Sequence, residues 1–494
     1  MTLEELKNFV REEAKPKPKA TINSYRSFGY NMQTAVADII DNSISARAGN
    51  VWIEYEWEGS NSWLTIRDDG NGMDIEGLVD ALTPGSKDPE DPRLSHDLGR
   101  FGMGLKTASF SQCKRLTVAS RVESCSSEIR CWDLDFVNHT GEWMLLELSP
   151  GIQHMQALEN SRKGTLIVWE KLDKLVGDSC AENDAVRRSF LKEMDLLEEH
   201  LGMIFHRYIE SRRLSIYLNG TQIDSWNPFL PKFGSTMMGK EFLGRGASTE
   251  VTVFILPHMS RLDELQRRIG EGPRGWYEQQ GFYIYRNQRM LVCGDWLGLF
   301  PRNEHSKLAR IAVDFNNDMD ADWALDIKKS TARPPFYLRA ELQRLGAAAI
   351  KGSASIYNHR GTLLKRNPNL PQFEFRPVWQ AVKTREEGIR YKINRAHPIV
   401  SSFTRDFPSG QCEKLLKLIE RSIPIETIIH YQSEDPGIHE LRKEAPELEA
   451  GMVDAARMIF SALCAQGSSS EIAVKQVLNI EPFNHYPQLI EYLK

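Results

Sequence analysis

Three short motifs near the start of the chain, in one order, constrain its fold more than any other feature of the sequence. A helix pattern over residues 31–49 places Asp38 and Asn42 four residues apart, a strand pattern ends in DDGNGMD (68–74), and GRFGMGLKTAS (99–109) leads into a second helix pattern. Glycine in the last two motifs allows tight turns and a close approach of backbone to a ligand. Each motif alone is common, and only their combination is informative.

The helix pattern NMQTAVADIIDNSISARAG carries a polar pair on one face. Its apolar stripe consists of Met32, Val36, Ile39, Ile40 and Ile44. Asp38 and Asn42 project from the same side, whereas Asp41 is turned away from Asn42 by about 100°. A carboxylate and a carboxamide together suit a general base and a metal-oxygen ligand. The alternative is an ordinary solvated polar face.

The motif DDGNGMD closes a strand pattern over residues 62–68 and has the form D-x-G-x-G. Asp68, at the strand end, can accept a hydrogen bond from an exocyclic amine. Asp69 is expected to point to the other side, because side chains alternate along a strand. A simple Asp-Gly turn is the alternative interpretation.

The glycine-rich stretch approaches the P-loop pattern without matching it. Gly99 and Gly104 have the P-loop separation, but Leu105 intrudes before Lys106. A P-loop also follows a buried strand, whereas the residues upstream here, DPRLSHDL, are mostly polar. Glycines that lead into a helix still form an anion site through free backbone N–H groups, to which Lys106 adds charge. A flexible turn before a helix is the alternative.

The order and spacing of the three motifs resemble the ATP-binding domain shared by gyrase, the ATP-driven heat-shock chaperones, histidine kinases and MutL. A fourth expected element, a Gly-Thr pair that opens a late strand, is present as Gly164-Thr165. The resemblance to this GHKL superfamily covers about residues 20–225. It implies an α+β protein with an N-terminal Bergerat-fold domain, an α/β sandwich.

The resemblance also implies roles for individual residues. Asp68 would bind the adenine amino group, Thr165 would support it through water, and Asn42 would hold Mg²⁺. The base pocket would be lined by Gly72 and Met73, and the phosphates would be cradled by Gly102, Met103, Gly104 and Lys106. Residues 84–104 would form a mobile lid. Asp38 stands where the family usually has a glutamate as general base, and aspartate is one methylene shorter, so we expect slow turnover. Asp41 would not contact the nucleotide directly but would support the residues that do.

Within the superfamily, AVADIIDNSISA and GRFGMGLKTASFSQCKRLTV are most similar to the prokaryotic MORC type. Only about 30 residues precede this helix pattern in the sequence, so we expect no kinase phosphoacceptor hairpin. Further along, IYRNQRML (284–291) and WALDIKKSTARPP (323–335) resemble an S5-like transducer domain. There a lysine reaches the γ-phosphate, and Lys329 is our choice, with Lys328 in reserve because only one can face the site. A solvated strand end is the alternative.

Other patterns complete the expected domain organisation. Strands are predicted over residues 51–57, 62–68, 115–121, 128–136, 142–149 and 164–172, with a helix over 187–210 and an Asn219-Gly220 hairpin over 214–223. We divide the chain into an N-terminal arm (1–25), an ATP-binding domain (26–226), a transducer (227–352) and a mainly helical C-terminal region (353–494).

The C-terminal region offers two charged segments. Residues 360–397 hold nine Lys or Arg against three Glu, with aromatic residues between them, and residues 434–454 hold seven Asp or Glu against two Lys or Arg. The basic segment could contact nucleic acid through phosphates and stacking. An ordinary domain surface is the alternative.

Composition limits the remaining function classes. The net charge of −5 shows no overall basic bias, the seven cysteines include no C-x-x-C pair, and no apolar run is long enough to span a membrane. We expect a cytosolic, Mg²⁺-dependent, MORC-like ATPase that dimerises on ATP binding. By resemblance it would act on DNA or a DNA-bound partner, with partner proteins in defence against phage. The alternatives are an Hsp90-like protein-remodelling ATPase and a nucleotide-gated scaffold that hydrolyses little ATP.

Overall fold

The computed structural model of the chain divides into two compact units, Met1–Tyr357 and Asn358–Lys494. It describes residues 9, 12, 14–86, 98, 102–244, 246, 248–324, 332–358, 377–384, 388–406, 411–424, 450–465, 467–480, 482–483 and 486–493. Across these residues, every helix is too short or too polar to cross a membrane.

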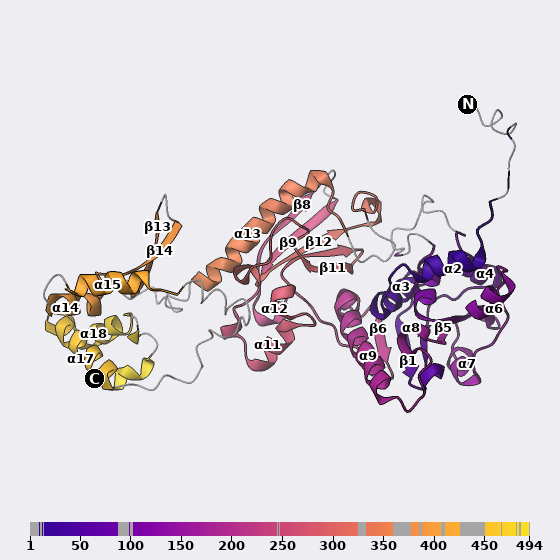
Figure 1. Cartoon of the computed structure of the whole chain (residues 1–494), viewed down its shortest axis with the longest axis horizontal. Coiled ribbons are helices and arrows are strands. Elements are labelled where there is room, and N and C mark those ends of the chain that lie inside the picture. Colours follow the sequence, from indigo (N-terminus) through magenta and orange to yellow (C-terminus); the bar gives the residue numbers. More distant parts are fainter. Residues whose placement is uncertain are drawn as a thin grey trace. The chain divides into compact units, whose positions relative to one another are not determined.

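A seven-stranded mixed sheet forms the centre of the N-terminal part of the first unit (Figure 1). Its order is β4-β3-β5-β2-β1-β6-β7. The strands are β1 (Asn50–Glu56), β2 (Trp63–Asp68), β3 (Arg115–Arg121), β4 (Glu128–Asp133), β5 (Gly164–Glu170), β6 (Ser215–Leu218) and β7 (Thr221–Gln222). Strands β1 and β6 are parallel, and the other neighbours are antiparallel.

Helices cover both faces of this sheet. They are α2 (Pro18–Arg26), α3 (Met32–Ser45), α4 (Ile75–Leu82), α5 (Gly104–Gln112), α6 (Leu134–Thr140), α7 (Ile152–Glu159), α8 (Asp173–Val176), α9 (Asp184–Ile204) and α10 (His206–Glu210), with a 3-10 turn at Gly59–Asn61. On one face, Ile40 of α3 and Phe110 of α5 share a core with Ile66 of β2. On the other, Leu158 of α7 packs against Val168 of β5. The α+β class predicted from the sequence is confirmed.

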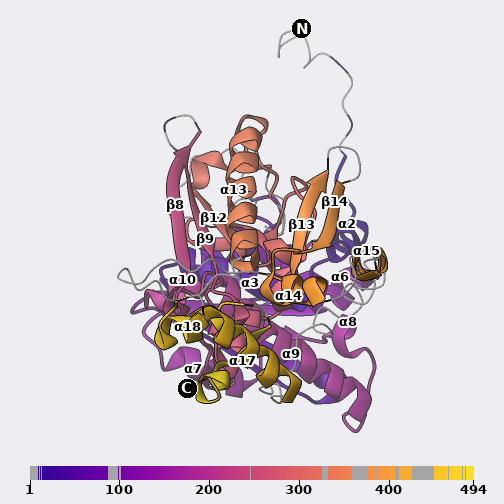
Figure 2. The ribbon, with the colours of Figure 1, turned by 90° about the vertical axis from the view of Figure 1, so that its left-hand side faces the viewer.

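A second sheet of five strands follows, in the order β11-β10-β12-β9-β8. The strands are β8 (Thr236–Leu243), β9 (Thr249–Ile255), β10 (Gly281–Arg286), β11 (Arg289–Asp295) and β12 (Ala309–Phe315). Helix α13 (Arg339–Asn358) lies along one face through Leu342 and Leu345 (Figures 1 and 2). From the opposite face, Tyr283 and Tyr285 reach into the core of the first sheet, so the two sheets are joined by apolar packing.

Shorter elements surround the second sheet. They are α11 (Glu264–Glu271), α12 (Gly275–Glu278) and 3-10 turns at Pro231–Phe233, Met259–Arg261, Glu304–Ser306, Asn317–Met319 and Phe336–Leu338. In the second unit, a hairpin of β13 (Trp379–Thr384) and β14 (Gly388–Ile393) precedes helices. These are α14 (Pro398–Asp406), α15 (Gln411–Arg421), α17 (Ala450–Ala465) and α18 (Ser470–Val477), with a 3-10 turn at Pro487–Glu491. Phe483 and Leu489 lie in the core of this mainly helical unit, which confirms the predicted helical C-terminal region.

Several local predictions were wrong. The strand predicted over residues 142–149 makes only an isolated bridge between Cys131 and Leu146. The strand predicted to continue to residue 136 ends at Asp133, because the Asp133 carboxylate caps helix α6 by accepting from the backbone N–H groups of Asp135 and Phe136. The helix predicted over 187–210 is interrupted at Phe205. Helices α2 and α4, strand β8 and the β13–β14 hairpin were not predicted.

Candidate functional site

Helix α3 carries the first two candidate residues. The Asn31 side chain accepts a hydrogen bond from the Thr34 N–H and so fixes the start of the helix. Asp38 is buried, and the Tyr30 hydroxyl donates to its Oδ2 (2.7 Å). Asn42, one turn later, is exposed. The carboxylate of this pair is therefore enclosed and oriented, which argues against an ordinary solvated face, while the carboxamide remains accessible.

Asp68 ends strand β2 inside the domain. The Ser43 hydroxyl donates to its Oδ2 (2.8 Å), and the Gly70 N–H donates to its Oδ1 (2.9 Å). Burial raises the pKa of this carboxyl, although the hydrogen bonds from Ser43, Gly70 and the Thr165 backbone act in the opposite direction. Two oriented oxygens are thus held at the end of the strand.

Asp69 turns away from this position, as strand alternation predicts. Its Oδ1 accepts from the backbone N–H groups of Gly49 (2.8 Å) and Asn50 (2.9 Å), and its Oδ2 accepts from the Asn50 side chain (2.8 Å). Asp69 therefore stabilises the loop between α3 and β1.

Two of the motif glycines are required by close approach of the chain to itself. A Cβ at Gly72, whose φ is +71°, would lie 1.9 Å from the Arg121 carbonyl oxygen. A Cβ at Gly164 would lie 2.1 Å from the Asp68 carbonyl oxygen. These glycines let the D-x-G-x-G turn and the start of β5 meet beside Asp68.

A buried serine on β3 connects the turn to β5. Ser120 Oγ accepts from the Met73 N–H (2.8 Å) and lies 2.9 Å from Thr165 Oγ1. Strand pairing also places Thr165 opposite Asp68. The structure thus brings together Asp68, Gly72, Met73 and Thr165.

Sequence reasoning missed Ser43 and Ser120. The available signal for Ser120 was a polar residue in line with the buried Leu116 and Val118 on β3. Ser43 lies on the buried side of α3 together with Gln33, Asp38 and Asp41, so its position alone did not single it out.

Helix α5 begins next to Asp38. A Cβ at Gly104 would lie 3.5 Å from Asp38 Oδ2, and Gly102 has a φ of +59°. Met103 is the N-cap residue, and its side chain does not cap the helix among the described residues. The first-turn N–H groups of a helix have no partner within the helix. Gly99 and the other residues of 99–101 lie outside the described residues.

Lys106 does not point out of this helix start. The side chain is buried, and Nζ donates to the carbonyl oxygens of Ala81 and Thr83 (2.9 Å each). It therefore supports the end of α4, where a cation is favourable. A phosphate contact by Lys106 would have to share an ammonium group that already donates to these two carbonyls, so that role stays a prediction.

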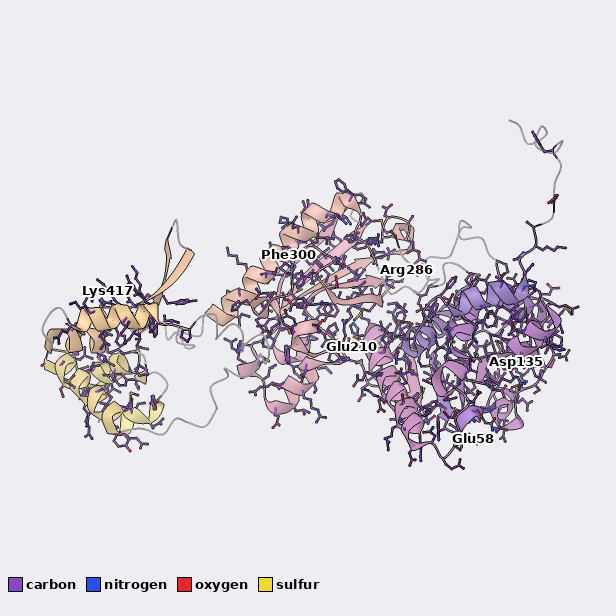
Figure 3. All side chains as sticks on the ribbon, viewed as in Figure 1. Glu58, Asp135, Glu210, Arg286, Phe300 and Lys417 are labelled. Carbon is purple, nitrogen blue, oxygen red and sulfur yellow. The ribbon has the colours of Figure 1, made fainter. Side chains whose placement is uncertain are left out.

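The second sheet also contacts this region through the β10–β11 hairpin, whose turn residues have positive φ. Arg286 Nη1 donates to the Leu98 carbonyl (3.1 Å), and the Leu98 N–H donates to Ser45 Oγ of α3 (3.1 Å). Figure 3 labels Arg286 at this end of the second sheet. Arg289 Nε donates to Asp41 Oδ1. Leu98, part of the predicted lid, is thus anchored from two sides.

Two predicted features fall partly or wholly outside the described residues. Lys328 and Lys329 both lie there. Of the predicted lid over residues 84–104, the structure describes only 84–86, 98 and 102–104.

Comparison with known proteins agrees with this geometry. Residues 30–165 match the family described as "Histidine kinase-, DNA gyrase B-, and HSP90-like ATPase". The protein "ATPase morc-1" of Caenorhabditis elegans is 31% identical over 88 residues, which are 18% of this chain and 10% of the relative. The chain thus matches about a tenth of the length of that relative. The matched interval contains every candidate residue except Lys329 and its reserve, Lys328.

Proposed function

We propose that this chain, whose residues 30–165 form a GHKL ATPase domain similar to that of MORC proteins, binds ATP with Mg²⁺ and hydrolyses it slowly. The observation that carries the proposal is the enclosed Asp68 carboxylate at the end of β2. Its position beside the glycine turn and Thr165 suits a base pocket. The start of α5, beside Asp38, suits the phosphate end of the same ligand.

Adenine recognition would use the remaining lone pairs of Asp68. Each carboxylate oxygen can accept more than one hydrogen bond. Ser43 donates to Oδ2 and Gly70 to Oδ1, and the Thr165 backbone also donates to this carboxyl. The 6-amino group of adenine is a donor that fits a further position. Thr165 would assist through water, and Gly72 and Met73 would line the pocket.

Mg²⁺ and the phosphates would bind at the other end of the site. Asn42 offers an exposed carboxamide oxygen, a ligand type that Mg²⁺ accepts. Among the described residues, no group of three His, Cys, Asp or Glu could hold a metal ion. Phosphate oxygens and water would therefore complete the coordination, while N–H groups near Gly102, Met103 and Gly104 bind the phosphates.

Asp38 would act as general base. Tyr30 holds Oδ2, and the approach of Gly104 to the same oxygen places the carboxylate beside the start of α5. Aspartate reaches less far than the glutamate usual at this position. This is why we expect slow turnover, and why a nucleotide-gated scaffold is the second candidate.

The predicted lid would couple ATP binding to the second sheet. Leu98 hydrogen-bonds both to Ser45 of α3 and to Arg286 of the second sheet. A rearrangement of residues 84–104 on ATP binding would therefore be transmitted to the second sheet through these bonds. We propose that ATP also recruits Lys329 and closes two copies of the chain into a dimer. On the resemblance to prokaryotic MORC-type proteins, we further propose that the chain acts on DNA or a DNA-bound partner, together with partner proteins in defence against phage.

The test is ATP binding and hydrolysis by the purified chain with and without DNA, beside Asp38→Asn and Asp68→Ala. Loss of hydrolysis in Asp38→Asn with retained ATP binding supports the enzyme. Binding that requires Asp68 without any hydrolysis supports the scaffold. Stimulation by an unfolded client protein rather than DNA would favour protein remodelling, and light scattering with a nonhydrolysable analogue tests the dimer.

A further inference from the structure

Three polar side chains stand in one row across neighbouring strands of the first sheet. Asp68 of β2 is directly opposite Thr165 of β5, and Thr165 is directly opposite Ser120 of β3. Directly opposite residues in an antiparallel pair point to the same face of the sheet. This is the face that α3 and α5 cover, because Ile66, two residues before Asp68, lies in their common core.

The row interrupts an otherwise apolar face. Two residues further along the strands, the corresponding row is buried in the core and consists of Ile66, Ile167 and Val118. Burying a carboxylate and two hydroxyls in such a place is costly unless each of them makes specific hydrogen bonds. The hydrogen bonds of this row therefore indicate what it does.

Ser120 differs from the other two residues in its access to a ligand. Asp68 and Thr165 retain exposed fractions of 6% and 8%, whereas none of the surface of Ser120 is exposed. A bound base can thus contact Asp68 and Thr165. Ser120 can act on the base only through Thr165, whose Oγ1 lies 2.9 Å from Ser120 Oγ.

The contacts of Ser120 limit how its hydroxyl is used. A hydroxyl has one hydrogen and two lone pairs, and the Met73 N–H occupies one lone pair across 2.8 Å. Two acceptors lie near the hydrogen, Thr165 Oγ1 at 2.9 Å and the Gly164 carbonyl oxygen at 3.3 Å. Hydrogen bonds between two oxygens are ordinarily no longer than about 3.0 Å, so the geometry favours donation to Thr165.

This direction of donation leaves the hydrogen of the Thr165 hydroxyl available to a ligand. The row then presents an acceptor, the Asp68 carboxylate, beside a donor, the Thr165 hydroxyl. Adenine carries the complementary pair on one edge, because its 6-amino group is a donor and the neighbouring ring nitrogen N1 is an acceptor. Guanine carries the reverse pair, a 6-oxo acceptor beside an N1–H donor.

We propose that Ser120 is a positioning residue for base recognition, which commits the Thr165 hydroxyl to donate toward N1 of adenine, directly or through one water molecule. The inference rests on the proposed function, because it concerns the same nucleotide site. A water molecule that accepts from Thr165 keeps both of its hydrogens, one for N1 and one for Asp68. Ser120 would thereby strengthen the preference for adenine over guanine that the Asp68 carboxylate provides.

Calorimetric titration with ATP and with 1-deaza-ATP, in which a C–H group replaces N1, tests this role. We expect the wild type to bind ATP about 10-fold more tightly than 1-deaza-ATP, the effect of about one hydrogen bond. Ser120→Ala and Thr165→Val should each lower this ratio to less than about 3-fold. Thermal unfolding without nucleotide shows whether each variant is folded.

Thr117→Val is the matched control. It also removes a buried hydroxyl from β3, but Thr117 is opposite Val168 on the other face of the sheet, which α7 covers. This variant should keep the ratio of the wild type.

The ratio separates positioning from a purely structural role. If Ser120 only held the glycine turn through Met73, Ser120→Ala would weaken both nucleotides equally and keep the ratio, which would overturn the proposal. Equal affinity of the wild type for ATP and 1-deaza-ATP would overturn it as well. A wild type that binds neither nucleotide would instead refute the proposed function, and this inference would fall with it.

A crystal structure of the wild type with a nonhydrolysable ATP analogue keeps the test open if Ser120→Ala does not fold. Thr165 Oγ1 should contact N1, or a water molecule bound to N1, while it stays within hydrogen-bond distance of Ser120 Oγ. A Thr165 hydroxyl turned away from Ser120 or from N1 would contradict the proposal.

Discussion

Arg289 of β11 donates from Nε to Oδ1 of the buried Asp41 across 3.2 Å, which links the second sheet to helix α3. The two side chains are 4% and 0% exposed. Asp41 directly precedes Asn42 and lies about one turn after Asp38. The contact therefore joins the hairpin of the second sheet to the helix that carries the candidate metal ligand and base.

Removing this arginine should destabilise the first unit strongly. Arg289→Ala removes the guanidinium that donates to the buried Asp41 carboxylate, and breaking a buried pair from one side costs about 3–5 kcal/mol. Chemical denaturation monitored by tryptophan fluorescence measures the change in the free energy of unfolding. Arg344→Ala, which breaks an ion pair between half-exposed side chains, is the control and should destabilise the chain far less, because solvent screens the pair. Similar losses in both variants would contradict a special role for the Arg289–Asp41 pair.

Gly72 should tolerate alanine much less well than Gly85. Both have similar φ, +71° and +74°, but a Cβ at Gly72 would lie 1.9 Å from the Arg121 carbonyl oxygen, while no atom of the described residues lies within 4 Å of one at Gly85. Gly85→Ala should cost about 1–2 kcal/mol for left-handed backbone alone. Gly72→Ala should cost clearly more and weaken ATP binding. Thermal unfolding and calorimetric titration with ATP check both, and equal losses would show that close approach does not matter.

These examples show how far the sequence predicts the site. The positions of Asp68, Gly72 and Thr165 follow from local rules, because strand alternation and glycine turns depend on neighbouring residues. Helix α4 was not predicted, because two buried residues, Leu78 and Leu82, are too few to form a clear helical pattern. Long-range partners could not be predicted at all. Arg289 and Asp41 are 248 residues apart, and no local pattern specifies which buried carboxylate a given arginine meets.

The raised pKa of Asp68 gives a pH-dependent prediction. An acid that is harder to ionise in the fold contributes stability at low pH, and this contribution is lost as pH rises through the raised pKa. Asp68→Asn removes the buried charge, and its amide can still accept from Gly70 and donate to Ser43. The stability of Asp68→Asn relative to the wild type should therefore increase from about pH 4 to pH 7, although ATP binding weakens. Tm values across this range measure it, and a constant difference would contradict the prediction.

Lys106→Met distinguishes two roles of one lysine. Methionine keeps much of the apolar stem but removes the donor to Ala81 and Thr83, which should cost about 1–3 kcal/mol and speed amide exchange in α4. Lys163→Met, at a lysine that bonds the Asn71 side chain on the surface, is the matched control. If exchange in α4 is unchanged while ATP affinity falls, Lys106 binds phosphate rather than supporting α4.

Variants of Tyr30 and Asp38 should lower the rate of ATP hydrolysis while they leave ATP affinity nearly unchanged. Asp38→Asn keeps the size of the side chain and a bond to the Tyr30 hydroxyl, but it removes the base, so we expect ATP hydrolysis to fall by at least about 100-fold. Tyr30→Phe keeps the base but releases its Oδ2, so the carboxylate loses orientation and hydrolysis should fall by about 10-fold. Neither residue belongs to the base pocket around Asp68, so ATP affinity should change little in both variants. Single-turnover hydrolysis beside calorimetric titration separates the two effects. If Tyr30→Phe weakened ATP binding as strongly as hydrolysis, the hydroxyl would shape the site as a whole rather than orient the base.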